Sequence, residues 1–443
     1  METPKLRFSI ALSHKNIYLS SLRKLEMIKK KNISMALMFT MMALGSQANG
    51  GVTVQDDSET IKRLTAEVKA QYAPDKRTAW FELEEENNKG TFEIETTVPE
   101  AKTAFETLLK ESGSQAKVNF RVLPDETVGD TRHAVVRLSV VDIRYTPANQ
   151  AEMVTQALLG TPVDLLKKRG GYFLVRTPEG YIAWLKDSSL ATMDAASYSA
   201  WTSANKLMFT EDFGHAYTEP NKNSLRVSDL VMGNIVKLDQ SNVIKGSDQT
   251  DFYAVSYPDG RKAFIPSNQS IPYAQWLADT ELTAENVLRV AKTMVGVPYL
   301  WGGTSVKGVD CSGLTKTAFY MSGLVIPRDA SQQVNSGLDI PILDADQKVD
   351  REKALTNLQP ADLLFFAERK GQTDNPRVTH VGIYIGNGEF IHASGLVRIN
   401  SLFADAENFD AHQARTIVSA KRYVGQSGNG LDKLEDHPAY AVK

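Results

Sequence analysis

The chain has 443 residues, of which 42% are hydrophobic and 23% charged, and its formal net charge is −3. This balance is typical of a soluble globular protein of roughly three domains, and it argues against electrostatic binding to nucleic acid or to an anionic membrane. The single cysteine, Cys311, excludes an intrachain disulfide, and its thiol is either buried and inert or kept for its reactivity.

The first predicted element is an export signal over residues 27–48. The lysines from Lys29 to Lys31 precede an apolar run from Ile33 to Leu44, and Ser46-Gln47-Ala48 supplies the small residues that a signal peptidase reads. The run is too short to span a bilayer as a mature helix, and no other segment is apolar enough to do so. Because Met27 stands just before the lysines, we expect translation to start there. The pattern predicts a secreted protein of the periplasm.

Residues 55–125 are expected to form a small N-terminal α/β region. Helical periodicity and strand-like alternation follow one another along this stretch. The expected elements, in order, are a helix over 58–71, strands over 78–83 and 91–97, a helix over 100–110 and a strand over 118–122.

An internal repeat occupies the middle of the chain. Residues 172–185 match residues 252–265, and each copy is an alternating strand, a Pro-acid-Gly turn and a second strand. This pattern is a hairpin signal. Two copies within stretches of short strands predict two β-barrels of one type. They resemble bacterial SH3 domains, over 130–195 and 225–272.

A third region opens at Thr283, which can cap a helix whose apolar stripe is expected to be core. Further on, Asp310 is a good N-cap, so Cys311 falls in the first turn of a second helix. The free N–H groups and the positive dipole end at such a turn favour a thiolate over a thiol, and they can stabilise an oxyanion. The alternative is a cysteine in a helix that merely packs.

A thiolate nucleophile needs a base, and two histidines lie close together downstream. His380 comes seven residues before Asn387-Gly388, a strong hairpin turn, and His392 comes four residues after it. Both histidines are therefore expected on paired strands of one sheet. There, His380 can face the thiol while His392 orients its imidazole through a hydrogen bond. Taken singly, each histidine is better interpreted as structural, and it is the cysteine at a helix start together with two histidines on one hairpin that favours a catalytic role.

Residues 283–425 resemble the NlpC/P60 family of cysteine peptidases. The resemblance is carried, in order, by Pro298 to Gly303, Asp310-Cys311-Ser312-Gly313, Asp362 to Phe366, Thr379 to Tyr384, and His392. It implies a papain-like fold with Cys311 as nucleophile, His380 as base and His392 as the orienting residue. Tyr299 resembles the tyrosine that helps to form the oxyanion site. The whole chain is thus expected to be an α+β multidomain protein, with two SH3-like barrels between a small α/β segment and a papain-like catalytic domain.

The layout further resembles the γ-D-glutamyl-L-diamino acid endopeptidases, also called dipeptidyl-peptidase VI. The resemblance implies a murein tripeptide or tetrapeptide substrate with a free N-terminal L-alanine, release of L-Ala-γ-D-Glu, and no cofactor. Asp310 and Ser312 are then candidates for binding the substrate amine, with Ser331 as a less firm match. Tyr181 is the candidate aromatic from the first SH3-like domain. An acidic residue from that domain is also implied, at a position that the sequence does not identify.

Other interpretations remain open on the residues alone. The same scaffold serves amidases and acyltransferases with Cys-His centres, and a wall-binding protein with SH3 repeats needs no catalysis. A metal site is not expected, because there is no second cysteine and no short His pair with ligand spacing. Residues 348–358 and 369–377 resemble insertions around the sheet. The polar, Gly-rich tail after Val424 is expected to be loose. The oligomeric state is not determined.

Overall fold

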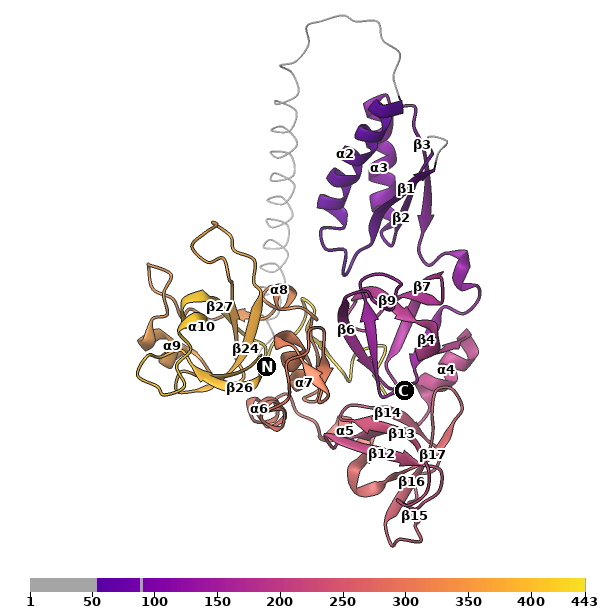
Figure 1. Ribbon diagram of the computed structural model, residues 1–443, viewed down its shortest axis with the longest axis vertical. Coiled ribbons are helices and arrows are strands. Elements are labelled where there is room, and N and C mark those ends of the chain that lie inside the picture. Colours follow the sequence, from indigo (N-terminus) through magenta and orange to yellow (C-terminus); the bar gives the residue numbers. More distant parts are fainter. Residues whose placement is uncertain (1–53, 88–90, 443) are drawn as a thin grey trace, which may run out of the picture. The chain divides into compact units, whose positions relative to one another are not determined.

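The computed structural model describes residues 54–87 and 91–442 (Figure 1). The predicted export signal at 27–48 lies outside these residues. The described part of the chain is rich in β-sheet and contains no helix that is long and apolar enough to span a bilayer.

The N-terminal region is a three-stranded sheet with two helices. Its elements are α2 (Val54–Tyr72), β1 (Phe81–Asn87), β2 (Thr91–Thr96), α3 (Pro99–Ser112) and β3 (Lys117–Val122). Strand β2 lies in the centre, antiparallel to β1 and parallel to β3, so α3 is the crossover that a parallel pair requires. Ile61, Leu64 and Phe105 are buried in its core. The elements lie within a few residues of the predicted ranges, because each carries its own periodicity.

The first β-region, as we call residues 133–193, is a seven-stranded sheet in the order β10-β4-β7-β8-β9-β5-β6. Its strands are β4 (His133–Val136), β5 (Val140–Arg144), β6 (Met153–Leu158), β7 (Pro162–Arg169), β8 (Tyr172–Arg176), β9 (Ile182–Lys186) and β10 (Leu190–Met193). The first copy of the repeat forms the hairpin β8–β9. Gly180 has φ +82° at its turn, which explains the glycine there.

The second β-region, residues 206–272, carries the second copy of the repeat as a hairpin in the same register. Leu174 faces Trp184 in the first copy, and Ala254 faces Phe264 in the second. The strands are β11 (Lys206–Phe209), β12 (Phe213–Tyr217), β13 (Arg226–Val231), β14 (Ile235–Leu238), β15 (Ile244–Lys245), β16 (Asp251–Ser256), β17 (Lys262–Pro266) and β18 (Ser270–Pro272). Because β11 and β12 belong to this sheet, it begins earlier than the predicted range of 225–272. Helix α4 (Ala195–Ser203) connects the two β-regions.

The C-terminal region packs helices against an antiparallel sheet in the order β22-β27-β23-β24-β25-β26. The sheet strands are β22 (Leu338–Asp339), β23 (Leu363–Phe366), β24 (His380–Gly386), β25 (Glu389–Ser394), β26 (Leu396–Ser401) and β27 (Ile417–Arg422). The helices are α5 (Tyr273–Asp279), α6 (Ala284–Thr293), α7 (Cys311–Tyr320), α8 (Ala330–Gln333), α9 (Arg351–Asn357) and α10 (Ala411–Thr416). Two short pairs complete it: β19 (Thr304–Ser305) with β20 (Gly308–Val309), and β21 (Leu324–Val325) with β28 (Asp432–Lys433). Helices α6 and α7 share one core with β24 and β25, to which Leu314, Phe319 and Ile391 belong.

The expectation of a loose tail after Val424 is wrong. Strand β28 pairs with β21, and Leu431 and Leu434 are buried in the core of the C-terminal region. The hydroxyl of Tyr273 donates to the backbone oxygen of Tyr440 at 3.0 Å. The segment is polar overall, but its few apolar side chains, Leu431 and Leu434 among them, are buried, and this burial holds the segment in place.

Candidate active site

The first turn of α7 holds Cys311, and Asp310 fixes where that helix begins. Asp310 Oδ1 accepts from the backbone N–H of Gly313 at 2.7 Å, and Oδ2 accepts from that of Gly302 at 2.9 Å. One carboxylate therefore joins the helix start to the preceding glycine turn. A Cβ on Gly313 would lie 1.9 Å from the backbone oxygen of Gly303, so this close approach requires glycine.

The hairpin β24–β25 places the two histidines in contact. His380 Nε2 and His392 Nδ1 are 2.8 Å apart, and the turn between their strands has Asn387 and Gly388 at positive φ, as the register predicted. On the far side of His392, its Nε2 lies 2.9 Å from Oδ1 of Asn400 on β26. Asn400 was not singled out in the sequence because it lies on the next strand, beyond the two histidines.

The chain of hydrogen bonds from Asn400 determines which ring nitrogens carry protons. The Asn400 amide nitrogen donates to the backbone oxygen of Asn408 at 2.8 Å, so its oxygen is the atom that faces His392. An amide oxygen only accepts, so His392 carries its proton on Nε2 and accepts at Nδ1 from His380 Nε2–H. The lone pair of His380 is thereby placed on Nδ1, the ring nitrogen that His392 leaves free.

The sulfur of Cys311 lies against the strand that carries His380. It accepts from the backbone N–H of Val381, the residue after His380, and from that of Ser312 in its own helix. Helix α7 packs on β24 and β25, so the thiol faces the sheet that holds both imidazoles. Two N–H groups at the sulfur are what a developing anion there requires.

Burial, however, keeps the thiol and the imidazole neutral at rest. Cys311 is 7% exposed; burial raises the pKa of its thiol to about 12, and the Asp310 carboxylate adds to the rise. Desolvation likewise lowers the pKa of His380 to about 3, with His392 as the next cause. The sequence predicted a resting thiolate. The helix end does lower the thiol pKa, but the loss of water outweighs it.

Tyr299 lies beside the thiol, twelve residues before it in the chain. Its backbone N–H donates to the backbone oxygen of Gly395 at 2.9 Å, which ties it to the loop after β25. Burial raises the pKa of Tyr299, and the nearby Cys311 adds to the rise. The side chain is therefore a neutral phenol, which can donate a hydrogen bond to an oxyanion.

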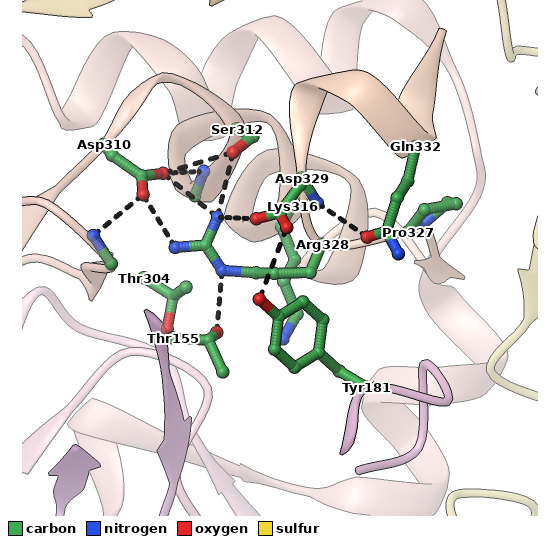
Figure 2. A network of polar contacts seen from close by, with 12 residues as sticks. Thr155, Tyr181, Thr304, Asp310, Ser312, Lys316, Pro327, Arg328, Asp329 and Gln332 are labelled. Carbon is green, nitrogen blue, oxygen red and sulfur yellow. Dashed lines mark hydrogen bonds and ion pairs between the residues drawn. The ribbon is translucent and has the colours of Figure 1, made fainter. Parts of the chain in front are cut away.

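Asp310 and Ser312 belong to a buried ionic network around Arg328, whose side chain is 0% exposed (Figure 2). Arg328 donates to Asp310 Oδ2 at 2.8 Å and to Ser312 Oγ at 2.9 Å. Its Nε donates to Thr155 Oγ1 at 2.7 Å, which links the site to β6 of the first β-region. Both oxygens of Asp310 are thus already hydrogen-bonded. The sequence predicted Asp310 as a ligand of the substrate amine, but it did not reveal that Arg328 already pairs with this carboxylate.

A second carboxylate, Asp329, stands where the first β-region meets the C-terminal region. The Tyr181 hydroxyl donates to Asp329 Oδ2 at 3.3 Å, and Arg328 Nη1 lies 3.8 Å from Oδ1 (Figure 2). Ser331 Oγ and Asp329 Oδ2 both accept from Arg77 of the N-terminal region. The structure therefore brings Tyr181 and Ser331 to one carboxylate. Asp329 itself was missed, although it lies two residues before Ser331.

The first β-region also supplies an acidic side chain next to the Tyr299 segment. Glu152 Oε1 accepts from Trp301 Nε1 at 2.8 Å. Trp301 is two residues after Tyr299 and is 60% exposed. Glu152 is thus a candidate for the acidic residue that the sequence implied without identifying it.

Comparison with known proteins gives consistent matches. Residues 296–416 match the NlpC/P60 family, and residues 143–190 match the bacterial dipeptidyl-peptidase Sh3 domain. Gamma-D-glutamyl-L-lysine dipeptidyl-peptidase of Bacillus cereus is 31% identical over 258 residues, which cover 56% of this chain and 68% of that protein. Dipeptidyl-peptidase 6 of Lysinibacillus sphaericus is 27% identical over 292 residues, which cover 65% of this chain and 98% of that protein.

Among solved structures, an NlpC/P60 family protein from Bacillus cereus has a TM-score of 0.51 at 23% identity. The match covers 66% of this chain and 99% of that one, and it shows a likeness of fold. The sequence match to the Bacillus cereus peptidase is above 30% identity and spans more than two thirds of that protein. The chain therefore belongs to the NlpC/P60 family of cysteine peptidases and carries a bacterial dipeptidyl-peptidase SH3 domain.

Proposed function

We propose that this protein hydrolyses the bond between γ-D-glutamate and the diamino acid of murein stem peptides with a free N-terminal L-alanine, releasing L-Ala-γ-D-Glu. The observation that carries the proposal is the Asn400–His392–His380 chain beside the buried thiol of Cys311. The names of the two relatives, a γ-D-glutamyl-L-lysine dipeptidyl-peptidase and a dipeptidyl-peptidase 6, support the choice of bond.

In the first proposed step, the Cys311 thiol transfers its proton to Nδ1 of His380 as the sulfur attacks the γ-carbonyl carbon of the D-glutamyl residue. The oxyanion that forms accepts from the Tyr299 hydroxyl. His380 returns the proton to the leaving amine of the diamino acid, and the C–N bond breaks. Water, deprotonated by His380, then attacks the thioester, the C–S bond breaks to release the dipeptide, and His380 returns the proton to the Cys311 sulfur.

Because both groups are neutral at rest, the ion pair forms only as the sulfur attacks. The imidazolium of His380 is then stabilised through His392, whose Nδ1 accepts its Nε2–H. At the sulfur, the N–H groups of Val381 and Ser312 stabilise the negative charge as it develops. His392 is thus proposed as the orienting residue, in the role that a carboxylate has in related triads.

For the substrate amine, we propose the site formed by Asp329, Tyr181 and Ser331, with Glu152 as the acidic residue from the first β-region. Asp310 and Ser312 contribute through Arg328, whose guanidinium lies between Asp310 and Asp329. An ammonium group removed from water needs a carboxylate and further acceptors. An acylated amine would leave that carboxylate unpaired, at a cost of about 1–3 kcal/mol.

Defined peptides and mass analysis of the products test the proposal. We expect cleavage of L-Ala-γ-D-Glu-diaminopimelate between the second and third residues, and little cleavage of the N-acetylated tripeptide or of intact wall. The Cys311→Ala variant should bind the tripeptide but not cut it. Release of an intact stem peptide from a muropeptide would indicate an amidase instead, and full biological activity of the Cys311→Ala variant would favour a non-catalytic wall-binding protein.

The finer architecture and the location belong to the same proposal. We infer that the second β-region is a second SH3-like barrel, because its hairpin β16–β17 repeats the register of β8–β9. We infer a papain-like arrangement from helix α7 against an antiparallel sheet that carries both histidines. Export to the periplasm is proposed from residues 27–48. N-terminal sequencing of the secreted protein should begin near Asn49, and retention of Lys29 would contradict it.

A further inference from the structure

An arginine from the N-terminal region is hydrogen-bonded to the same side chains that are proposed to bind the substrate amine. Arg77 lies between α2 and β1, and its Nη1 donates to Asp329 Oδ2 at 2.6 Å and to Ser331 Oγ at 3.1 Å. More than 250 residues separate it from these partners in the chain. Its positively charged guanidinium therefore lies where the ammonium group of the substrate is expected to bind.

Arg77 has a second anionic partner that does not depend on the site. Asp75 accepts from Nε and Nη2 of Arg77, both at 2.7 Å, in a two-point ion pair within one short segment. The segment is itself anchored, since Ile182 N–H donates to the backbone oxygen of Arg77 and Gln332 donates to Asp75. Arg77 can therefore give up Asp329 and remain paired with Asp75.

The charges around Asp329 leave room for one more cation. The network contains three carboxylates, Asp75, Asp310 and Asp329, and only two guanidinium groups, Arg77 and Arg328. Three negative and two positive charges leave one negative charge uncompensated. An ammonium group from the substrate would balance it, whereas an acylated amine would not.

There is also space next to Arg77, in a cavity that Asp329 does not line. A cavity of about 300 Å³ between the N-terminal region and the first β-region is lined by Arg77, Tyr181, Trp80, Tyr145, Trp184 and Lys76. Arg77 and Tyr181 are the two lining residues that also bond to Asp329. A small rotation of the guanidinium away from Asp329 therefore has room to occur without moving the backbone.

We propose that Arg77 is a specificity-determining residue, which holds Asp329 and Ser331 until the ammonium group of the substrate takes its place. This inference rests on the proposed function of the same site. On binding, Arg77 pairs with Asp75 alone and the ammonium pairs with Asp329. A peptide without an ammonium end cannot replace the arginine, so the amino end of the cleft stays closed to it.

Two substitutions with opposite expected effects test the inference. Arg77→Met removes the competing cation, so KM for L-Ala-γ-D-Glu-diaminopimelate should fall about fivefold to tenfold with kcat within about twofold. Turnover of the N-acetylated peptide relative to the free one should rise.

Asp75→Asn removes the alternative partner, so Arg77 holds Asp329 more firmly and KM for the free peptide should rise. Arg169→Met, an arginine of the same cavity without an ion pair to Asp329, is the control and should match the wild type.

The two hypotheses fail in different ways. If the wild type leaves the free tripeptide uncut, the proposed function is wrong and this inference falls with it. If the wild type cuts it but Arg77→Met and Asp75→Asn both raise KM, or neither changes it, Arg77 only holds the regions together and the inference alone is overturned. Thermal unfolding checks that the variants fold. Arg77→Lys is the second variant, and its weaker, single-point cation should give a KM between those of the wild type and Arg77→Met.

Discussion

At the scale of single residues, the site depends on which atoms carry protons. Asn400 has a fixed orientation because its amide nitrogen donates to Asn408, and this fixes the tautomers of His392 and His380 in turn. In the proposed mechanism, the lone pair that accepts the thiol proton is thus set by a residue two hydrogen bonds away from His380. Asn400 is then a positioning residue and not a catalytic group.

Replacing Asn400 tests this chain of hydrogen bonds. Asn400→Leu removes the acceptor, so His392 can adopt the other tautomer, and we expect kcat to fall about 10²-fold with KM nearly unchanged. Asn400→Asp keeps an acceptor and adds a charge that stabilises the imidazolium of His392. That variant should retain most of the activity while the acid limb of its pH–rate profile moves to higher pH. Equal losses and unchanged profiles in both variants would contradict the positioning role.

The neutral His380 also makes stability depend on pH. Its pKa falls from 6.5 to about 3 on folding, so below pH 6.5 the unfolded chain takes up a proton that the folded chain does not. Stability is therefore lost as the pH falls, by about 1.4 kcal/mol per pH unit for this group. The advantage of the wild type over His380→Gln in urea unfolding should shrink by about 2 kcal/mol from pH 7 to pH 5. A constant difference would contradict the lowered pKa.

At the scale of elements, the start of α7 positions Cys311, and the hairpin β24–β25 positions His380 and His392. The helix begins at Cys311 because Asp310 caps it and because Gly313 packs directly on the oxygen of Gly303. The hairpin register follows from the turn at Asn387 and Gly388. Each element is specified by a few neighbouring residues, so each can be disturbed by one substitution.

Gly313→Ala should displace the start of α7. The added methyl group would lie 1.9 Å from the oxygen of Gly303, so the glycine turn must move and the thiol moves with it. We expect a loss of about 1–3 kcal/mol in unfolding free energy and a fall in kcat of at least tenfold. Gly260→Ala is the control, because no atom lies within 4 Å of its added methyl group and only its positive φ is strained. Similar kcat values for both variants would show that the helix start tolerates movement.

At the scale of the whole molecule, ion pairs join the repeated hairpin turns to other regions. Glu179, in the turn of the first copy, pairs with Lys316 of α7, and Asp259, in the turn of the second copy, pairs with Arg137 of the first β-region. Glu179 is buried, which opposes its ionisation, but the ammonium of Lys316 lowers its pKa overall. The acidic residue of each turn therefore serves a contact between regions.

Glu179→Gln should destabilise the molecule. It leaves the Lys316 ammonium, whose side chain is 18% exposed, without its carboxylate, at a cost of about 1–3 kcal/mol. The double variant Glu179→Gln with Lys316→Met should recover much of that loss, because no unpaired charge remains. Calorimetric unfolding of the four proteins in this cycle gives the coupling. Additive losses would show that the pair contributes nothing between the regions.

The local parts of this protein were determined by the sequence itself. The helix that begins at Cys311, the hairpin that pairs His380 with His392 and the repeated hairpins depend on caps and turns of a few residues, so their signals stand in the chain. The NlpC/P60 resemblance combined these local signals into one family. For the same reason, the elements of the N-terminal region were predicted to within a few residues.

Only the tertiary structure decided the properties that depend on long-range contacts and on burial. Arg77 and Asp329 meet across more than 250 residues, and Asn400 joins the histidines from a neighbouring strand. The neutral state of the Cys311 thiol follows from the removal of water, which the positive end of the helix does not overcome. These properties depend on distances in space, which the pattern of residues along the chain does not specify.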